Sequence, residues 1–370
     1  YWSECIIMEF LAGNRIRGTS AEKPVLGLPS GSVGGWKELK RVKGSVPDIT
    51  SLPNKKYYMV LGHHIQGSGN TGIGMQLNGD TTAGHYPRRY TDDGTGTDAT
   101  PTTETNMFID TNGSTVTGKE WFTVMYISNE TTKEKIGLYN TSSNRGGTTA
   151  STTPYRITGT WKWTDTSNSI DRINFSDFNG TACNANSEVV VLGWDTTDTH
   201  TDNFWEELVS VTQASDAATL DTQTFTPKKY MWMQIFGDSS NNLSPSITFN
   251  GETAGATNDK YTLRNQHNGS ADDTSEVNIE WIALNQGGSA SHNEYFSNIF
   301  FLNDSSYEKL IHVNTVENDT SGTSGIPSRT NVWGKWTDVL TQINRITLAF
   351  RDGGSGNVLA GTTIKVWGHD

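Results

Sequence analysis

Two adjacent histidines, His63 and His64, are the side chains of this sequence best suited to metal binding. A zinc site would need further ligands at the same point. Neighbouring residues of a strand point to opposite faces, so the two rings cannot readily share one ion. Near the matching place of a repeat described below, the chain carries Asp238 and Ser239 instead. We expect structural histidines at a strand end or in a loop, and keep both as candidates for a ligand or subunit contact.

Repeated carboxylates are the second candidate chemistry, because glycoside hydrolysis needs two acids facing each other across a cleft. Four glutamates occupy matching positions of the two halves of the chain: Glu120, Glu134, Glu294 and Glu308. Structural ion pairs with Lys135 and Lys309 explain this pattern at least as well. The sequence also lacks the HExxH, GxSxG, phosphate-loop and dinucleotide motifs. We therefore expect no catalytic residue and no enzyme.

Two oxygen-rich segments could hold calcium. They are Asp92-Asp93-Gly94 and the group formed by Asp195, Asp198 and Asp202. Neither has the ligand spacing of an EF-hand. The prediction is solvated turns and no cofactor, with calcium left open as the one alternative.

The composition favours a β protein and excludes several functions. The 370 residues carry 28 Lys and Arg against 40 Asp and Glu, a net charge of −12, which disfavours nucleic-acid binding. The two cysteines, Cys5 and Cys183, cannot build a disulfide framework, although one bridge between them stays open. No apolar run is long enough to span a bilayer, so membrane insertion is not expected, and no secretory signal is visible. Abundant Gly, Ser, Thr and Asn disfavour helices, while 12 Trp, 12 Tyr and 13 Phe can fill a core.

The sequence contains two copies of one module, which align at a nearly constant shift. Trp36 aligns with Trp205, and the segment 120–140 aligns without gaps on 294–314. The segment from Lys162, KWTDTSNSIDRIN, matches KWTDVLTQINRIT from Lys335 at seven of thirteen positions. These blocks are collinear, so we predict module one at residues 36–195, a linker at 196–204 and module two at 205–370. Residues 1–35 are predicted to form an N-terminal arm or anchor.

Apolar residues alternate with polar ones in both modules, as in strands with one buried face. Strands are predicted at 57–61, 74–77, 122–127, 135–139 and 189–193, and around 173–175 and 346–350. Turn dipeptides separate them, including Asn112-Gly113, Asn179-Gly180 and Gly353-Gly354. Six to eight strands in each module predict an all-β chain of two tandem antiparallel, jelly-roll-like β-sandwiches. The segment WKELKRV, from Trp36, is left open between a strand and a helical turn.

Side chains shared by both modules are expected to serve the fold. The sequence Asn-Gly-Asp/Glu-Thr, at 78–81 and 250–253, predicts a turn whose Asn and Gly accept a positive φ. As an alternative, Asn78, Asp80, Asn250 and Glu252 are candidates for a ligand or subunit contact. Trp163 and Trp336 are predicted to plug the core at a strand start, rather than to stack on sugar rings. The other repeat-paired residues are Asp165 with Asp338 and Arg172 with Arg345.

These motifs, in this order, resemble β-sandwich modules in structural proteins of tailed phages and of marine bacterial and archaeal viruses. The resemblance rests on Trp-x-Glu-Leu, Lys-x-Tyr, Asn-Gly-Asp/Glu, Lys-Trp-Thr-Asp with Ile-x-Arg-Ile, and the final Gly-Trp/His-Asp. It covers both modules but not the arm, and it implies a non-enzymatic virion protein, such as a tail fibre, appendage or surface decoration. The partners that it implies are copies of the chain itself and other virion proteins. Such a protein would be made in the host cytoplasm and leave the cell in particles.

Two other functions stay open. One is a carbohydrate-binding or cell-surface adhesive protein, in which exposed Trp and Tyr would stack on a host-surface glycan. The other is a double jelly-roll capsid subunit. The mass of the purified protein and a glycan array would separate assembly from sugar binding.

Overall fold

A computed structural model describes the chain in ranges that include most of both modules. The described residues are 35–67, 72–92, 98–109, 119–144, 149–177, 183–195, 198, 202–238, 244–252, 260–267, 273–285, 294–318, 327–350 and 356–370. The predicted arm lies outside them except for Gly35, as do the turns at Asn112-Gly113, Asn179-Gly180 and Gly353-Gly354. Asp93, Gly94, Thr253 and Cys5 also lie outside. Every regular element within the described ranges is a strand, which confirms the predicted fold class.

Module one contains eleven strands within the described part of the chain. They are β1 (Lys37–Lys43), β2 (Asp48–Ile49), β3 (Tyr57–Ile65), β4 (Ile73–Leu77), β5 (Arg88–Asp92), β6 (Met107–Phe108), β7 (Glu120–Ser128), β8 (Lys135–Ser143), β9 (Tyr155–Trp163), β10 (Ile173–Asp177) and β11 (Glu188–Trp194).

Module two contains twelve strands within the described ranges. They are β12 (Glu206–Thr212), β13 (Leu220–Asp221), β14 (Tyr230–Gly237), β15 (Pro245–Phe249), β16 (Tyr261–His267), β17 (Asp273–Ile279), β18 (Ile282–Ala283), β19 (Tyr295–Leu302), β20 (Lys309–Glu317), β21 (Ser328–Trp336), β22 (Ile346–Phe350) and β23 (Thr363–His369).

Each module is a sandwich of one large and one small antiparallel sheet. The large sheet of module one has the order β1-β11-β3-β7-β8-β9-β5, and the small one β2-β10-β4-β6. Module two repeats both orders strand for strand, as β12-β23-β14-β19-β20-β21-β16 and β13-β22-β15-β18, and adds β17 at one edge. This shared topology is what an internal duplication predicts. Equivalent strands can therefore be compared residue by residue.

The predicted strands are present, but their number was predicted too low. Four of the described strands, β2, β6, β13 and β18, have only two residues each, too few to show a periodic pattern. The segment left open after Trp36 is strand β1. It forms one edge of its sheet, as β12 does in module two. Both edge strands are bulged, between Glu38 and Lys40 and between Glu207 and Val209.

Each sandwich has its own apolar core. Tyr58, Val60 and Met125 belong to the core of module one, and Met231 and Ile299 to that of module two. Cys183 is buried in the core of module one. Trp163 and Trp336 are buried as predicted, but each lies at the end of its strand, β9 or β21, and not at a strand start.

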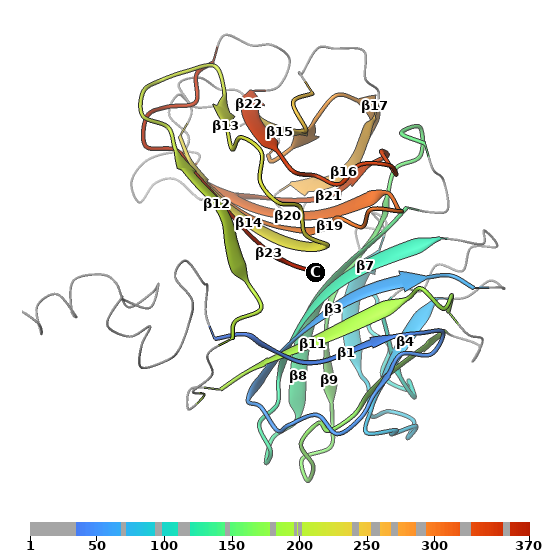
Figure 1. Ribbon diagram of the computed structural model, residues 1–370. Helices are drawn as coiled ribbons and strands as arrows, with labels where there is room; N and C mark the ends of the chain where they lie inside the picture. The colour runs from blue at the N-terminus through green and yellow to red at the C-terminus, as the bar shows by residue number, and fades with distance from the viewer. Residues whose placement is uncertain are drawn as a thin grey trace, which may run out of the picture.

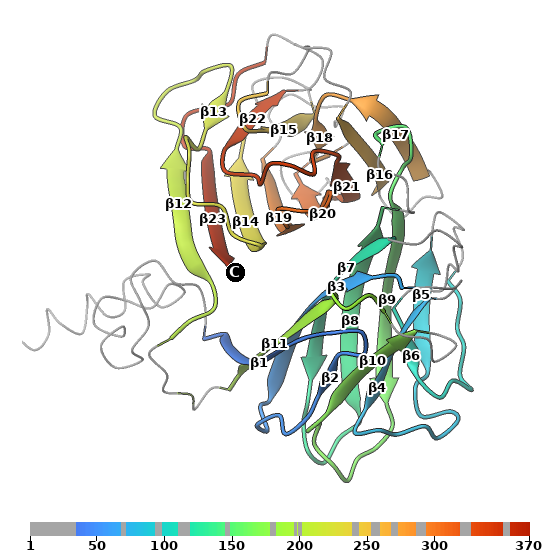
Figure 2. The same cartoon turned by 45° about the vertical axis from the view of Figure 1, so that its right-hand side comes forward.

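A third apolar cluster joins the modules. It contains residues from β3, β7 and β11 of module one together with residues from β14, β19, β20 and β23 of module two. Figure 1 shows the two sandwiches in contact, one above the other. In Figure 2 the large sheets are turned toward each other and the small sheets lie on the outside. The outer faces of the large sheets are therefore the surfaces from which any site between the modules is built.

Candidate interaction surface

The Asn-Gly turns are used inside each module. Asn78 and Asn250 both have a φ of 53°, and the glycines after them also have positive φ, as predicted. The Asn78 amide donates to the Ser169 carbonyl at 2.8 Å, and its oxygen accepts from the Asp171 backbone N–H at 2.9 Å. Asn250 makes the matching bonds, donating to the Gln342 carbonyl and accepting from the Asn344 N–H, both at 2.9 Å. Each side chain thereby fixes the loop before the next strand of the small sheet.

The acids after these turns are paired within their own modules too. Asp80 accepts from the Trp163 indole at 2.7 Å and contacts His85 Nδ1 at 2.6 Å. Burial acts to raise the pKa of Asp80, but these hydrogen bonds outweigh it and hold the pKa well below the usual range. Glu252 accepts from Lys260 at 2.8 Å and from the Tyr261 hydroxyl at 2.5 Å. The contacts described for these four turn residues thus lie within their own modules.

The other repeat-paired side chains also stabilise the fold. Arg172 binds Asp48 through two hydrogen bonds, at 2.8 and 2.7 Å, and Arg345 binds Asp221 in the same way. These pairs link the strand β10 or β22 to its short neighbour β2 or β13. Asp165 and Asp338 each accept two backbone N–H bonds from the loop that follows them.

The two histidines lie on opposite faces of β3, as the strand geometry predicts, and both are fully buried. His64 packs against Phe175 in module one, with ring centroids 4.9 Å apart. His63 points to the junction between the modules, 5.2 Å from the ring of Tyr307. Asp238 lies next to the matching positions, as predicted, and Ser239 lies outside the described residues. The pairing of β14 with β19 places Phe236 and Gly237 at these positions.

The glutamates form ion pairs, but the predicted lysine partners, Lys135 and Lys309, were wrong. Glu134 binds Lys162 at 2.9 Å, and Glu308 binds Lys335 at 3.4 Å. The reason is the strand period, because the residue next to a glutamate points to the other face. The pairing of β8 with β9 sets Lys162 opposite Ile136, two residues after Glu134 and on the same face. Lys135 and Lys309 instead donate to the backbone carbonyls of Asp165 and Asp338.

An open, mostly apolar groove of about 810 Å³ lies on the outer face of the large sheet of module one. Its lining includes Trp36, Tyr57, Tyr126, Ile136, Leu138 and Trp194. Tyr57 stacks on Trp194 with ring centroids 5.5 Å apart. Ile136 is 57% exposed and Leu138 48% exposed, although both are large apolar side chains. Lys162 lines the groove and forms an ion pair with Glu134.

The same surface of module two is covered by module one. The residues equivalent to Trp36, Tyr57, Tyr126, Ile136 and Leu138 are Trp205, Tyr230, Phe300, Leu310 and His312. All five are at most 3% exposed. They pack on an apolar strip of module one made of Met59, Leu61, Phe122, Val124, Val190 and Leu192. One groove of the duplicated pair is therefore filled within the chain, and the other is open.

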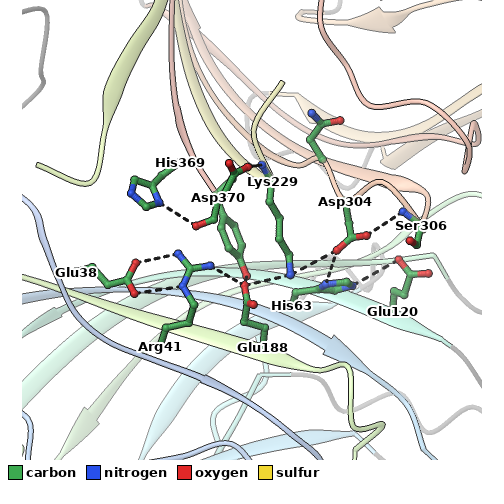
Figure 3. Close-up of polar contacts among 12 residues, drawn as sticks. Glu38, Arg41, His63, Glu120, Glu188, Lys229, Asp304, Ser306, His369 and Asp370 are labelled. Atoms are coloured by element: carbon green, nitrogen blue, oxygen red, sulfur yellow. Dashed lines mark hydrogen bonds and ion pairs between the residues drawn. The ribbon is translucent and has the colours of Figure 1, made fainter. Parts of the chain in front are cut away.

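A chain of charges borders this junction (Figure 3). Glu188 of module one accepts from Arg41 at 3.0 Å, from the Tyr230 hydroxyl at 2.9 Å and from Lys229 at 3.1 Å. Burial acts to raise the pKa of Glu188, but Lys229 and Arg41 outweigh it and lower the pKa. Lys229 lies 3.5 Å from Asp304. Complementary charges thus fix how module two sits on module one.

Glu120 and His63 lie at the far end of this charge chain, with Oε2 and Nε2 3.8 Å apart (Figure 3). Burial, together with the charges of Glu308 and Asp304, raises the pKa of Glu120 to about 9. Burial and the charge of Lys229 hold the pKa of His63 well below its usual range. The glutamic acid is therefore the protonated partner at neutral pH.

The raised pKa of Glu120 predicts a loss of stability in alkali. A carboxyl whose pKa is higher in the folded protein stabilises fully below its unfolded pKa, 4.5, and this contribution is lost as the pH rises through 9. Between these values wild type should lose about 1.4 kcal/mol per pH unit relative to Glu120→Gln, which cannot ionise. Urea unfolding of both proteins at pH 5 and pH 8 measures this difference.

The matched control for that experiment is Glu294→Gln, at the exposed counterpart in module two. Parallel stability curves for wild type and Glu120→Gln would contradict the assignment of a protonated Glu120.

The acids of the two oxygen-rich segments, predicted to be solvated turns with calcium as the alternative, pair with other side chains where they can be described, and Asp92 ends strand β5. Asp198 pairs with Lys55, and Asp202 lies 3.3 Å from Lys37. Asp92 accepts from the Tyr155 hydroxyl at 3.0 Å. Within the described ranges no three His, Cys, Asp or Glu side chains are grouped so that they could hold a metal ion. The described residues also contain no helix long and apolar enough to cross a membrane.

The described residues form two antiparallel β-sandwiches, and an open aromatic groove lies on the first of them. No protein-family model matches the sequence, and no curated protein matches it. Among solved structures, domains LG4-5 of the mouse laminin alpha1 chain share 10% sequence identity over 91% of this chain and 89% of that chain, at a TM-score of 0.15. A TM-score this low supports no inference about function.

Proposed function

We propose that the chain is a non-enzymatic structural protein that self-assembles as a surface or appendage component of a virus particle. Its partners would be copies of itself and other virion proteins, and it would be extracellular after release. The open groove of module one carries this proposal. Soluble monomers rarely expose a contiguous apolar surface of this kind, and such surfaces mark sites of association. The repeat-paired side chains support the same view, because each of them stabilises its module.

The mass of the purified protein in solution tests this function. Sedimentation or light scattering from about 1 to 100 µM should show species heavier than the 40.6 kDa chain, and their share should grow with concentration. A monomer at every concentration would contradict the proposal. Imaging of the assembled species would then distinguish fibres from shells.

Sugar binding in the same groove is the second candidate function. The observation in its favour is the stacked pair Tyr57 and Trp194, because aromatic faces can pack on sugar rings. A monomer that binds members of a glycan array, and loses this binding in the variant Trp194→Ala, would favour this function over self-assembly.

A further inference from the structure

Two buried carboxylic acids meet at the junction between the modules, one from each side. Glu120 begins β7 of module one and is 4% exposed, and Glu308 directly precedes β20 of module two and has a fully buried side chain. Burial raises the pKa of Glu308 to about 7, against the lowering effect of Lys335 and Asn144. Asn144 also donates to Glu120 Oε1 at 3.5 Å, so its amide lies beside both carboxyls. The two acids therefore form one group across the junction.

The duplication shows that the junction buries these acids, and not the module to which each belongs. Glu294 is the counterpart of Glu120 and is exposed. Glu134 is the counterpart of Glu308, and its side chain is 40% exposed. Both counterparts lie on surfaces that the other module does not cover. Separation of the modules would therefore return Glu120 and Glu308 to water without unfolding either sandwich.

Both modules contribute the other titratable and charged groups around the acids. They are His63 of β3, Lys229 next to β14, Asp304 and Tyr307 between β19 and β20, Lys309 of β20, and Lys335 of β21. Burial holds the pKa of His63 well below 6.5 and lowers the pKa of Lys309 to about 8. Between pH 7 and pH 8 the histidine is therefore neutral and the lysine largely charged. The acids are the groups whose ionisation changes most on opening in this range.

We infer that the junction between the modules is a pH-sensitive contact, which opens in mild alkali as Glu120 ionises while each sandwich stays folded. A carboxyl that is neutral in the closed junction and ionised in the open one makes opening about 10-fold more favourable per pH unit. Each module has its own apolar core, which separation leaves intact. The open form would expose the groove of module two, with Trp205, Tyr230 and Phe300. This inference goes beyond the proposed self-assembly and does not depend on it.

Labelling of a cysteine placed in the junction tests this inference. The reporter is Val124→Cys in a Cys5→Ser chain, because Val124 is 2% exposed in the apolar cluster between the modules. Its rate of reaction with Ellman's reagent is divided by the rate of glutathione at the same pH, which corrects for the thiolate fraction. This ratio should rise about 10-fold from pH 7 to pH 8. Adding Glu120→Gln should remove most of the rise, and adding Glu294→Gln should leave it unchanged.

The native Cys183 distinguishes opening of the junction from unfolding, because it is buried in the core of module one. A rise at the reporter that requires Glu120 and is absent at Cys183 establishes the opening. An equal rise at Cys183, a rise that persists with Glu120→Gln, or no rise at the reporter overturns it. If Val124→Cys does not fold, Ser142→Cys is the second reporter. Ser142 is fully buried at the same junction, 2.9 Å from His312 Nε2, and cysteine is close to it in size.

Discussion

Replacing Lys335 with methionine is expected to cost about 3 kcal/mol of unfolding free energy, the usual loss when one partner of a buried ion pair is removed. Lys335 and Glu308 are both fully buried, 3.4 Å apart, and Lys335 also donates to the Thr149 carbonyl of module one at 3.0 Å. The variant leaves the Glu308 carboxyl buried without its cation. Burial already raises the pKa of Glu308 to about 7 against the opposing effect of Lys335, so protonation can relieve part of the loss at low pH.

The duplication supplies a matched control for Lys335→Met. Lys162 forms the equivalent pair with Glu134, but both side chains there are substantially exposed, at 43% and 40%. Lys162→Met should therefore cost less than about 1 kcal/mol, as is usual for exposed pairs. Urea unfolding of both variants at pH 7 gives the comparison. Equal losses at the two positions would contradict the view that the junction buries this pair.

Replacing Trp205 with alanine should destabilise the protein by about 3 to 5 kcal/mol, the range for a large aromatic side chain removed from a packed interior. Trp205 is fully buried in the cluster that joins the modules. Its ring contacts Phe204 and Trp232 edge-on, at centroid distances of 4.9 and 5.8 Å. Hydrogen exchange should show the largest loss of protection along β14 and β19, which carry the module two side of the junction.

Trp36→Ala is the matched substitution in the open groove. Trp36 is only partly buried and makes an edge-on contact with Tyr126, at 6.5 Å. In a monomeric sample, Trp36→Ala should lower the free energy of unfolding clearly less than Trp205→Ala does. A loss at Trp36 as large as the loss at Trp205 would show that the two surfaces are not used differently.

Much of the fold could be predicted from the sequence because it depends on local chemistry. Alternating apolar residues mark strands, Asn-Gly marks tight turns, and the collinear repeat defines two similar modules. The prediction of the ion pairs failed because their partners depend on the register between strands. Glu134 directly precedes β8 and Lys162 lies on β9, and only the pairing of these two strands brings them together.

The groove and the junction were not predicted, although the sequence contains a signal for them. Residues 121–127, Trp-Phe-Thr-Val-Met-Tyr-Ile, are apolar at six of seven positions instead of alternating. Such a run indicates a strand buried on both faces, in this case by the core and by a neighbouring module. Which of two equivalent runs stays open cannot be read from either run alone, because it depends on how one sandwich packs against the other.

The bulges in β1 and β12 affect how copies of the chain can meet. A regular edge strand offers a row of free N–H and C=O groups to which another chain can add a strand, as in amyloid. A bulge interrupts this row and twists the strand, so backbone pairing is disfavoured at these two edges. The proposed self-assembly would therefore depend on side-chain packing between whole sandwiches, and not on backbone pairing at these two edges.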